Sequence, residues 1–176
     1  MKLSPMAQGA LPHVDLQRLR RTLGNYPTGV SVVTAIDADG APAGMAVGTF
    51  TSVSLDPPLI AFLPARSSTS FPRISAATSF CVNVLAADQD DVCRTFATRG
   101  GDKFAGVAWS HAPSGAPRLH GTAAWIDCDL ESITTVGDHY FVLGRVRTFD
   151  SGSDALPLVF FRGEYGHLTP RSMRGR

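Results

Sequence analysis

The stretch Met45-Ala-Val-Gly-Thr-Phe-Thr-Ser-Val-Ser-Leu-Asp-Pro-Pro-Leu-Ile60 decides the fold of this chain. An apolar run predicted as a strand leads into a cluster of hydroxyl side chains. The pair Pro57-Pro58 then forces a turn, because proline has no N–H to donate to a sheet. A second predicted strand, residues 59–63, follows at once. A segment of small residues held between two strands suits a flat heteroaromatic ring, which needs close backbone approach, hydrogen bonds and apolar walls.

The composition indicates one globular domain. The chain has 176 residues, of which 44% are apolar and 18% charged, which is enough for a real core. The net charge of +1 gives no reason to expect nucleic acid or a membrane as a partner. No apolar run approaches the roughly 20 residues that cross a bilayer, and residues 1–12 do not read as a signal peptide. Cys81, Cys93 and Cys128 form no Cys-x-x-Cys pair, so we expect reduced core residues in a cytoplasmic protein.

Most of the chain is β-branched or alternates in polarity, which predicts strands. The expected strands are residues 29–36, 43–50, 59–63, 80–85, 121–133, 140–149 and 158–161. The expected helices are residues 15–23, 67–76 and 88–98, with a hairpin turn at 37–40 and mainly loop over 99–117. Short hairpins with longer crossovers predict a mainly β protein, a closed antiparallel barrel with Greek-key links. No Gly-x-Gly-x-x-Gly follows a strand, and Val30 stands where a P-loop needs lysine, so neither nucleotide motif is supported.

Two segments have the residue types of an anion site. Arg66-Ser67-Ser68-Thr69-Ser70 precedes a predicted helix, and hydroxyls, helix amides and a guanidinium together suit a phosphate. The alternative is that these hydroxyls only cap the helix. Lys103, in Asp102-Lys-Phe-Ala-Gly106, is one of two lysines and either reaches the same phosphate or lies in solvent.

Gly137-Asp138-His139 is expected at the turn between two long strands. Histidine presented at a barrel rim can donate a hydrogen bond near neutral pH, although a plain surface turn explains the same residues. The remaining histidines have no metal-ligand spacing. Asp127, Asp129 and Glu131 share one strand face, which we interpret as solvated and not as a metal cage.

Six motifs, in this order, resemble the flavin reductase-like family, specifically the small reductase component of two-component flavin-dependent monooxygenases. They are Tyr26-Pro-Thr-Gly-Val30, Ser52-Val-Ser-Leu-Asp-Pro-Pro-Leu59, Phe80-Cys-Val-Asn-Val-Leu85, Asp102-Lys-Phe-Ala-Gly106, Gly137-Asp-His139 and Phe161-Arg-Gly-Glu-Tyr-Gly166. The resemblance runs from about Leu19 to about Gly166, nearly the whole chain.

The resemblance implies a six-stranded split barrel over residues 15–168, flanked by a flexible segment 1–14 and a flexible tail 169–176. It implies an oxidoreductase that uses NADH, or NADPH, to reduce FMN or FAD and supplies reduced flavin to a partner monooxygenase. It also implies a homodimer with the flavin near the subunit interface. Two alternatives stay open: a non-catalytic flavin carrier, and an oxidase-like barrel with fixed FMN.

The site residues follow from these motifs. His139 is expected to orient the hydride donor, with no covalent role and no metal. The expected cofactor-binding residues are Thr28, Val47, Gly48, Thr49, Thr51, Ser52, Ser54, Arg66, Ser67, Ser68, Lys103 and Tyr165.

Overall fold

The computed structural model describes residues 14–152 and 154–168. The expected flexible ends, residues 1–13 and 169–176, lie outside this part, apart from Val14. The described helices are α1 (Leu16–Leu23), α2 (Phe71–Ser75) and α3 (Asp90–Ala97). The described strands are β1 (Thr28–Gly29), β2 (Ser31–Ile36), β3 (Pro42–Val47), β4 (Thr51–Leu55), β5 (Pro58–Phe62), β6 (Ser79–Val84), β7 (Trp109–His111), β8 (Pro117–Leu119), β9 (Ala124–Val136), β10 (His139–Asp150), β11 (Leu158–Phe161) and β12 (Glu164–His167).

Seven antiparallel strands form the main sheet, in the order β3-β2-β6-β9-β10-β5-β4. Two smaller sheets, β1-β11-β12 and β7-β8, flank it. The expectation of a mainly β protein with few helices is confirmed. The expectation of a closed six-stranded barrel is wrong, because β3 and β4 remain the two edges of the seven-stranded sheet.

The barrel stays open where the chain passes from β3 to β4. Residues 48–50 leave the sheet there, so no backbone ladder joins the two edges. A side chain makes the local contact instead: Thr49 Oγ1 accepts from the Leu63 amide at 2.9 Å and donates to the Leu63 carbonyl oxygen at 3.2 Å. Residues 48–50 thus connect the two edge strands, β3 and β4, at the open end of the curled sheet.

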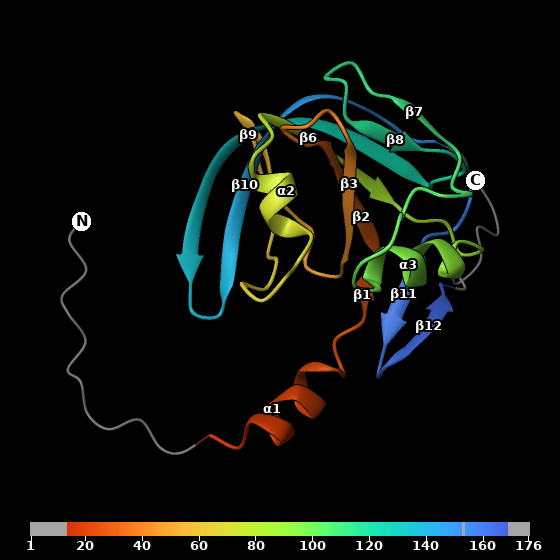
Figure 1. Ribbon diagram of the computed structural model, residues 1–176. Coiled ribbons are helices and arrows are strands. Elements are labelled where there is room, and N and C mark those ends of the chain that lie inside the picture. Colours follow the sequence, from red (N-terminus) through yellow and green to blue (C-terminus); the bar gives the residue numbers. More distant parts are fainter. Residues whose placement is uncertain (1–13, 153, 169–176) are drawn as a thin grey trace.

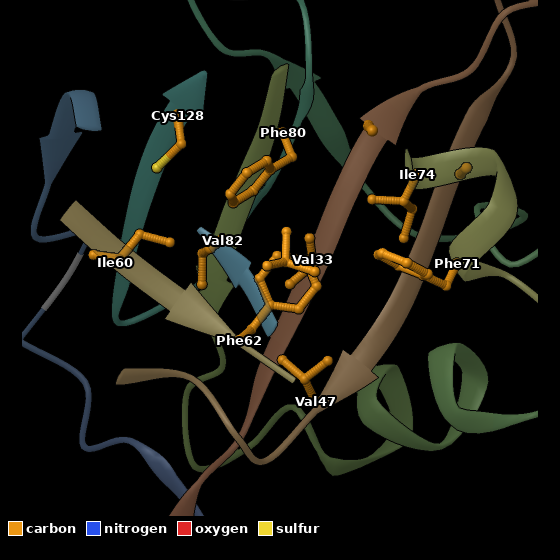
Figure 2. Packing of buried hydrophobic residues seen from close by; sticks show 12 residues of the cluster. Val33, Val47, Ile60, Phe62, Phe71, Ile74, Phe80, Val82 and Cys128 are labelled. Carbon is orange, nitrogen blue, oxygen red and sulfur yellow. The ribbon is translucent and has the colours of Figure 1, made fainter. Parts of the chain in front are cut away.

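The curled sheet encloses the main core (Figures 1 and 2). Phe62 of β5 is fully buried and lies among Val33, Val47 and Phe80 from the opposite side of the curl. The rings of Phe62 and Phe80 meet edge to face, with centroids 5.4 Å apart. Burying such side chains stabilises each by roughly 1.5–3 kcal/mol. The short helix α2 closes this core with Phe71 and Ile74, which are both buried.

A second core lies on the other face of β2. Val32 points into it, whereas its neighbour Val33 points into the first core, as alternation along a strand requires. Helix α3 contributes Cys93 and Phe96 to this second core, and its buried face packs against β2 and β3. The two helices therefore flank β3 and hold its end in place. No described helix has the length and apolar character to cross a membrane.

Several helix and turn predictions are confirmed. Asp15 caps α1, its carboxylate accepting from the Gln17 and Arg18 amides at 2.9 and 3.1 Å. The turn at residues 37–40 joins β2 to β3, with Gly40 at a φ of 77°.

Other boundaries differ from the sequence prediction. The helix expected over 67–76 covers only Phe71–Ser75, so the serine run before it is a loop. Strands β4, β7, β8 and β12 were not predicted. The expected solvated face of β9 is wrong at Asp127, which is fully buried and accepts from the Ser114 amide at 2.9 Å. The turn between β7 and β8 covers this end of the strand, whereas Asp129 and Glu131 are in exposed ion pairs.

The three cysteines are free and buried, as expected.

Candidate functional site

A pocket of about 200 Å³ lies where β3, residues 65–70 and the C-terminal end of α3 meet. The Lys103 ammonium lies in its lining and donates to Ser70 Oγ at 2.8 Å and to the Phe96 carbonyl oxygen at 2.9 Å. A third, longer contact of 3.4 Å leads to the Gly44 carbonyl oxygen. All three acceptors are neutral, so these bonds position the ammonium without neutralising its charge.

A second cation and several hydroxyl groups complete this pocket. Arg99 lies in the lining and, within the described residues, makes no hydrogen bond or ion pair. Ser67, Ser68 and Thr69 line the opposite side. No aspartate or glutamate of the described part lines the pocket. Two cations and hydroxyl donors without an opposing carboxylate are the donor set that a phosphate prefers.

Burial and a neighbouring positive charge both lower the pKa of Lys103. Burial is the larger cause that lowers its pKa, and the Arg73 guanidinium adds to the shift in the same direction. A bound anion would offset both effects, because it stabilises the charged form of the lysine.

The serine loop, residues 64–70, serves the fold as well. Ser68 Oγ accepts from the Phe71 amide at 3.2 Å, whereas Ser70, the N-cap residue of α2, makes no side-chain cap hydrogen bond. Helix α2 starts three residues later and is only one turn long, so its amides do not form the anion site that the sequence suggested. The phosphate prediction for Ser67 and Ser68 depends on the pocket that they line and not on a helix end.

Arg66 lies outside the lining of this pocket. Its side chain is exposed, and its amide donates to the Asp138 carbonyl oxygen at 2.9 Å. Of the predicted phosphate residues, the structure brings Ser67, Ser68 and Lys103 together and places Arg66 at their border. Its role in phosphate binding stays a prediction.

A second pocket, of about 160 Å³, lies farther along β3. Val47 and Gly48 line it together with Tyr165 of β12, and Ala46 and Ala97 are common to both pockets. A Cβ at Gly48 would lie 3.1 Å from Thr28 Oγ1, so glycine allows the Thr28 side chain to pack closely against this end of β3. Four of the predicted cofactor-binding residues, Thr28, Val47, Gly48 and Tyr165, are therefore neighbours.

Tyr165 is held in place by its surroundings. Its hydroxyl lies 3.2 Å from Cys93 Sγ, and the Arg94 guanidinium lies over its ring, 4.9 Å from the centroid. The contact with Cys93 is the main cause that raises the pKa of Tyr165 to about 12, so the phenol is neutral at physiological pH. It can therefore act as a hydrogen-bonding wall of the pocket and not as a charged group.

The other predicted hydroxyls are not gathered around these pockets. Thr49 is used by the contact to Leu63, and Thr51, Ser52 and Ser54 lie along the edge strand β4. Thr51 and Ser52 are exposed, and Ser54 is half-buried. None of the four lines either pocket. Their contact with a ring stays a prediction.

His139 starts β10 at the tip of the long β9–β10 hairpin. The tip is docked on the serine loop: His139 forms an isolated bridge with Ala65, and the Tyr140 amide donates to the Pro64 carbonyl oxygen at 2.9 Å. His139 Nδ1 lies 2.7 Å from the Asp138 carboxylate, and this contact is the main cause that lowers the pKa of Asp138. The histidine therefore lies beside the segment that lines the phosphate pocket.

Sequence reasoning missed Arg99 and the arrangement around it. Arg99-Gly100-Gly101 was included in a long loop, although an arginine followed by two glycines after a helix is a signal for an exposed cation on an open turn. Within the described residues, no three His, Cys, Asp or Glu side chains are placed to hold a metal ion.

Comparison with known proteins gives the family. The protein-family model described as "Flavin reductase like domain" matches residues 23–169 of this chain. The chain belongs to the flavin reductase-like family.

Members of this family include close relatives. A flavin reductase of Pseudomonas putida is 54% identical over 87% of this chain and 90% of its own length. The reductase subunit HsaB of a flavin-dependent monooxygenase from Rhodococcus jostii is 44% identical over 89% of this chain and 80% of its own length. A solved NADH:FAD oxidoreductase from Streptomyces globisporus, in complex with NAD and FAD fragments, is 35% identical, with a TM-score of 0.84 over 90% of this chain and 95% of that chain.

The two pockets adjoin and differ in character. The first is lined by two cations and several hydroxyl groups, and the second by the apolar side chains of Val30, Val47 and Phe160 together with Tyr165. Ala46 and Ala97 connect the two regions, so one ligand can reach both.

Proposed function

We propose that this protein is an NAD(P)H:flavin oxidoreductase that supplies reduced flavin to a separate monooxygenase. The observation that carries the proposal is the pocket that holds Lys103 and Arg99, with no carboxylate in its described lining, next to the open end of β3. The names of the relatives support the same activity: one is a flavin reductase and another is the reductase subunit of a flavin-dependent monooxygenase.

In the proposed reaction, NAD(P)H, oxidised flavin and a proton give NAD(P)⁺ and reduced flavin. The bound flavin supplies the hydride acceptor, and the nicotinamide supplies the hydride. The protein contributes binding and orientation. Lys103, Ser67 and Ser68 hold the phosphate, while Gly48 and Tyr165 bound the space for the ring. A backbone amide at the ring edge would stabilise negative charge that grows there on reduction.

His139 is proposed to orient the nicotinamide. It lies on the hairpin tip that docks on the serine loop, and its ring is partly exposed, so one nitrogen can reach a ligand. It transfers no hydride, and no metal is needed for this role.

The test is a reaction of purified protein with NADH and excess free flavin. Repeated turnover of added flavin supports the reductase. Tightly bound flavin without NADH oxidation would identify a carrier, and oxidation of an organic amine by bound FMN would identify an oxidase. Either of these two outcomes would overturn the proposal.

A homodimer is proposed from the exposed face of α1. No residue of α1 is buried, and Leu16, Leu19 and Leu23 lie on one face of it. Figure 1 shows α1 standing apart from the sheets. Leu16 is 67% exposed and Leu23 62%, which is unusual for leucines at helical spacing, so a second copy is the proposed cover.

Light scattering tests this proposal. We expect a mass of twice 18.7 kDa, and we expect Leu19→Glu to shift it toward the monomer. Gln17→Glu, an exposed change on the same helix, is the control. A flavin-competent wild-type monomer would refute the homodimer.

Two further expectations belong to the same proposal. Residues 15–168 act as one flavin reductase-like domain, and the protein works in the cytoplasm, as three free, buried cysteines suggest.

A further inference from the structure

Cys93 of α3 is a buried cysteine that lines the second pocket, the one bounded by Tyr165. All three cysteines of the chain lie in its described part. The other two, Cys81 and Cys128, line neither this pocket nor the phosphate pocket. Cys93 is therefore the cysteine whose side chain can affect a ligand in this pocket.

The hydroxyl of Tyr165 is held by the sulfur of Cys93. The two atoms are 3.2 Å apart, and the phenol is the stronger donor of the pair, so its O–H is directed to Sγ. This contact is the main cause that raises the pKa of Tyr165, and it opposes the larger rise that burial gives to the pKa of Cys93. Because the phenol proton is directed to sulfur, the phenol oxygen keeps its lone pairs and can accept a hydrogen bond from a ligand.

Two other neighbours hold the ring of Tyr165 and not its hydroxyl. The Arg94 guanidinium lies 4.9 Å from the ring centroid, and the Phe160 ring is tilted against it with the centroids 5.4 Å apart. Arg94 is in turn 3.7 Å from the Asp90 carboxylate, one helical turn away. These contacts limit where the ring lies, whereas the contact with Cys93 sets the direction of the hydroxyl.

Helix α3 links this contact to the phosphate pocket. Cys93, Phe96 and Ala97 are three and four residues apart, so they lie on one face of the helix. The Phe96 carbonyl oxygen accepts from the Lys103 ammonium at 2.9 Å, and Ala97 lines both pockets. One turn of α3 therefore sets the spacing between the Lys103 ammonium and the Tyr165 hydroxyl.

We propose that Cys93 is a positioning residue for the flavin, which fixes the Tyr165 hydroxyl so that this wall of the second pocket fits the flat ring. The inference rests on the proposed function, in which the ring occupies the second pocket and the phosphate lies beside Lys103. Cys93 acts through Tyr165 and makes no bond to the flavin. Lys103 is held by a backbone carbonyl of α3 and not by the thiol, so loss of the thiol should affect the ring and not the phosphate.

The experiment measures the binding of oxidised riboflavin and FMN by flavin fluorescence, without NADH. Cys93→Ala should weaken both flavins by the same factor, about twofold to tenfold, which is the loss expected for one neutral hydrogen bond. Cys128→Ala is the matched control, because it removes the same buried sulfur from a position that lines neither pocket. It should lower stability in urea unfolding and leave the affinity for both flavins unchanged.

A double-mutant cycle tests whether Cys93 acts through Tyr165. Tyr165→Phe should weaken riboflavin by a factor similar to that of Cys93→Ala, and Cys93→Ala should cause no further loss when Phe already occupies position 165. The absorbance of tyrosinate tests the contact itself, over the pH range in which circular dichroism shows an intact fold. Cys93→Ala should shift the ionisation of Tyr165 from about 12 toward 10, and Cys128→Ala should not.

Three results would overturn the proposal. They are an undiminished effect of Cys93→Ala in the Tyr165→Phe background, an equal loss of flavin affinity in Cys128→Ala, and an ionisation of Tyr165 that does not respond to Cys93→Ala. The first two would make Cys93 a core residue that acts through packing or stability. Coupled effects of Cys93 and Tyr165 on riboflavin, in a protein that does not oxidise NADH, would refute the proposed reductase and keep the positioning role.

Discussion

Replacement of Lys103 by methionine removes one of the two positive charges that line the phosphate pocket while keeping most of the side-chain volume. Two of the ammonium protons are used in short bonds to Ser70 and Phe96, at 2.8 and 2.9 Å. The third makes only the 3.4 Å contact to Gly44, so it is the donor that a phosphate can take over. One charge-assisted hydrogen bond contributes about 1.5–3 kcal/mol, which corresponds to roughly tenfold to hundredfold in affinity.

The same change should also lower the stability of the folded protein. The Phe96 carbonyl is at the C-terminal end of α3, where it has no partner within the helix, and it loses the lysine. An acceptor left without a partner costs about 1–3 kcal/mol, so we expect Lys103→Met to lower the free energy of unfolding by an amount in this range.

The assay compares FMN with riboflavin, which has no phosphate. Lys103→Met should weaken FMN tenfold or more and leave riboflavin nearly unchanged, and urea unfolding gives the stability change independently. Arg147→Met removes one positive charge at an exposed ion pair and serves as the control for net charge. Equal weakening of FMN and riboflavin by a folded variant would refute the placement of the phosphate beside Lys103.

Three further predictions concern other parts of the molecule. Gly144→Ala should destabilise the protein by about 1–3 kcal/mol in urea unfolding, because its Cβ would overlap the buried ring of Phe80. His139→Ala should raise the KM for NADH and lower turnover while the flavin dissociation constant changes little, and a chelator should affect neither form. Burial raises the pKa of Cys81 to about 12 and also raises that of Cys128, so stability conferred by these thiols should fall as pH rises from about 9 toward 12, as measured by unfolding at each pH.

Each of these predictions has a result that contradicts it. Gly166→Ala is the control for the glycine change, since its Cβ would meet nothing within 4 Å, and equal effects of the two would argue against overlap. Loss of wild-type activity with chelator and its return with zinc would exclude the proposed role of His139. For the thiols, stability falls as pH rises because the unfolded cysteines lose protons above pH 9 that the folded cysteines keep. A free energy of unfolding that stays constant between pH 9 and 12 would be inconsistent with their burial.

The strands were largely predictable because their side chains alternate or are β-branched. Residues 29–36, 80–85 and 140–149 were predicted to within one or two residues of the observed strands. The edge strand β4 was missed because three of the four side chains in its Thr-Ser-Val-Ser sequence carry hydroxyls, and the strand is stabilised by pairing with β5. Closure of the barrel could not be judged either, since it depends on whether residues 48–50 continue a backbone ladder.

Burial of Asp127 shows the limit of periodicity. Alternation placed it correctly on the face opposite Cys128, but the distant β7–β8 turn covers that face at this one position. The chemistry of the local sequence predicted Ser67, Ser68 and Lys103, which the structure brings to one pocket, whereas Arg99 was missed. Its role depends on the distance between the end of α3 and the serine loop, which are far apart in sequence.

The docking of the β9–β10 tip links the segments that carry the two proposed binding roles. The Ala65–His139 bridge, the Arg66 amide bond and the Tyr140 amide bond fasten the tip to the loop that leads into Ser67. The group proposed to orient the nicotinamide and the residues proposed to bind the flavin phosphate are thus joined through backbone contacts. A displacement of the loop would therefore also displace His139, so a change at the proposed phosphate site is expected to affect the use of NADH as well. Lengthening the Gly137-Asp138 turn by one residue should displace His139 from the loop, and we expect it to raise the KM for NADH while the flavin affinity changes less.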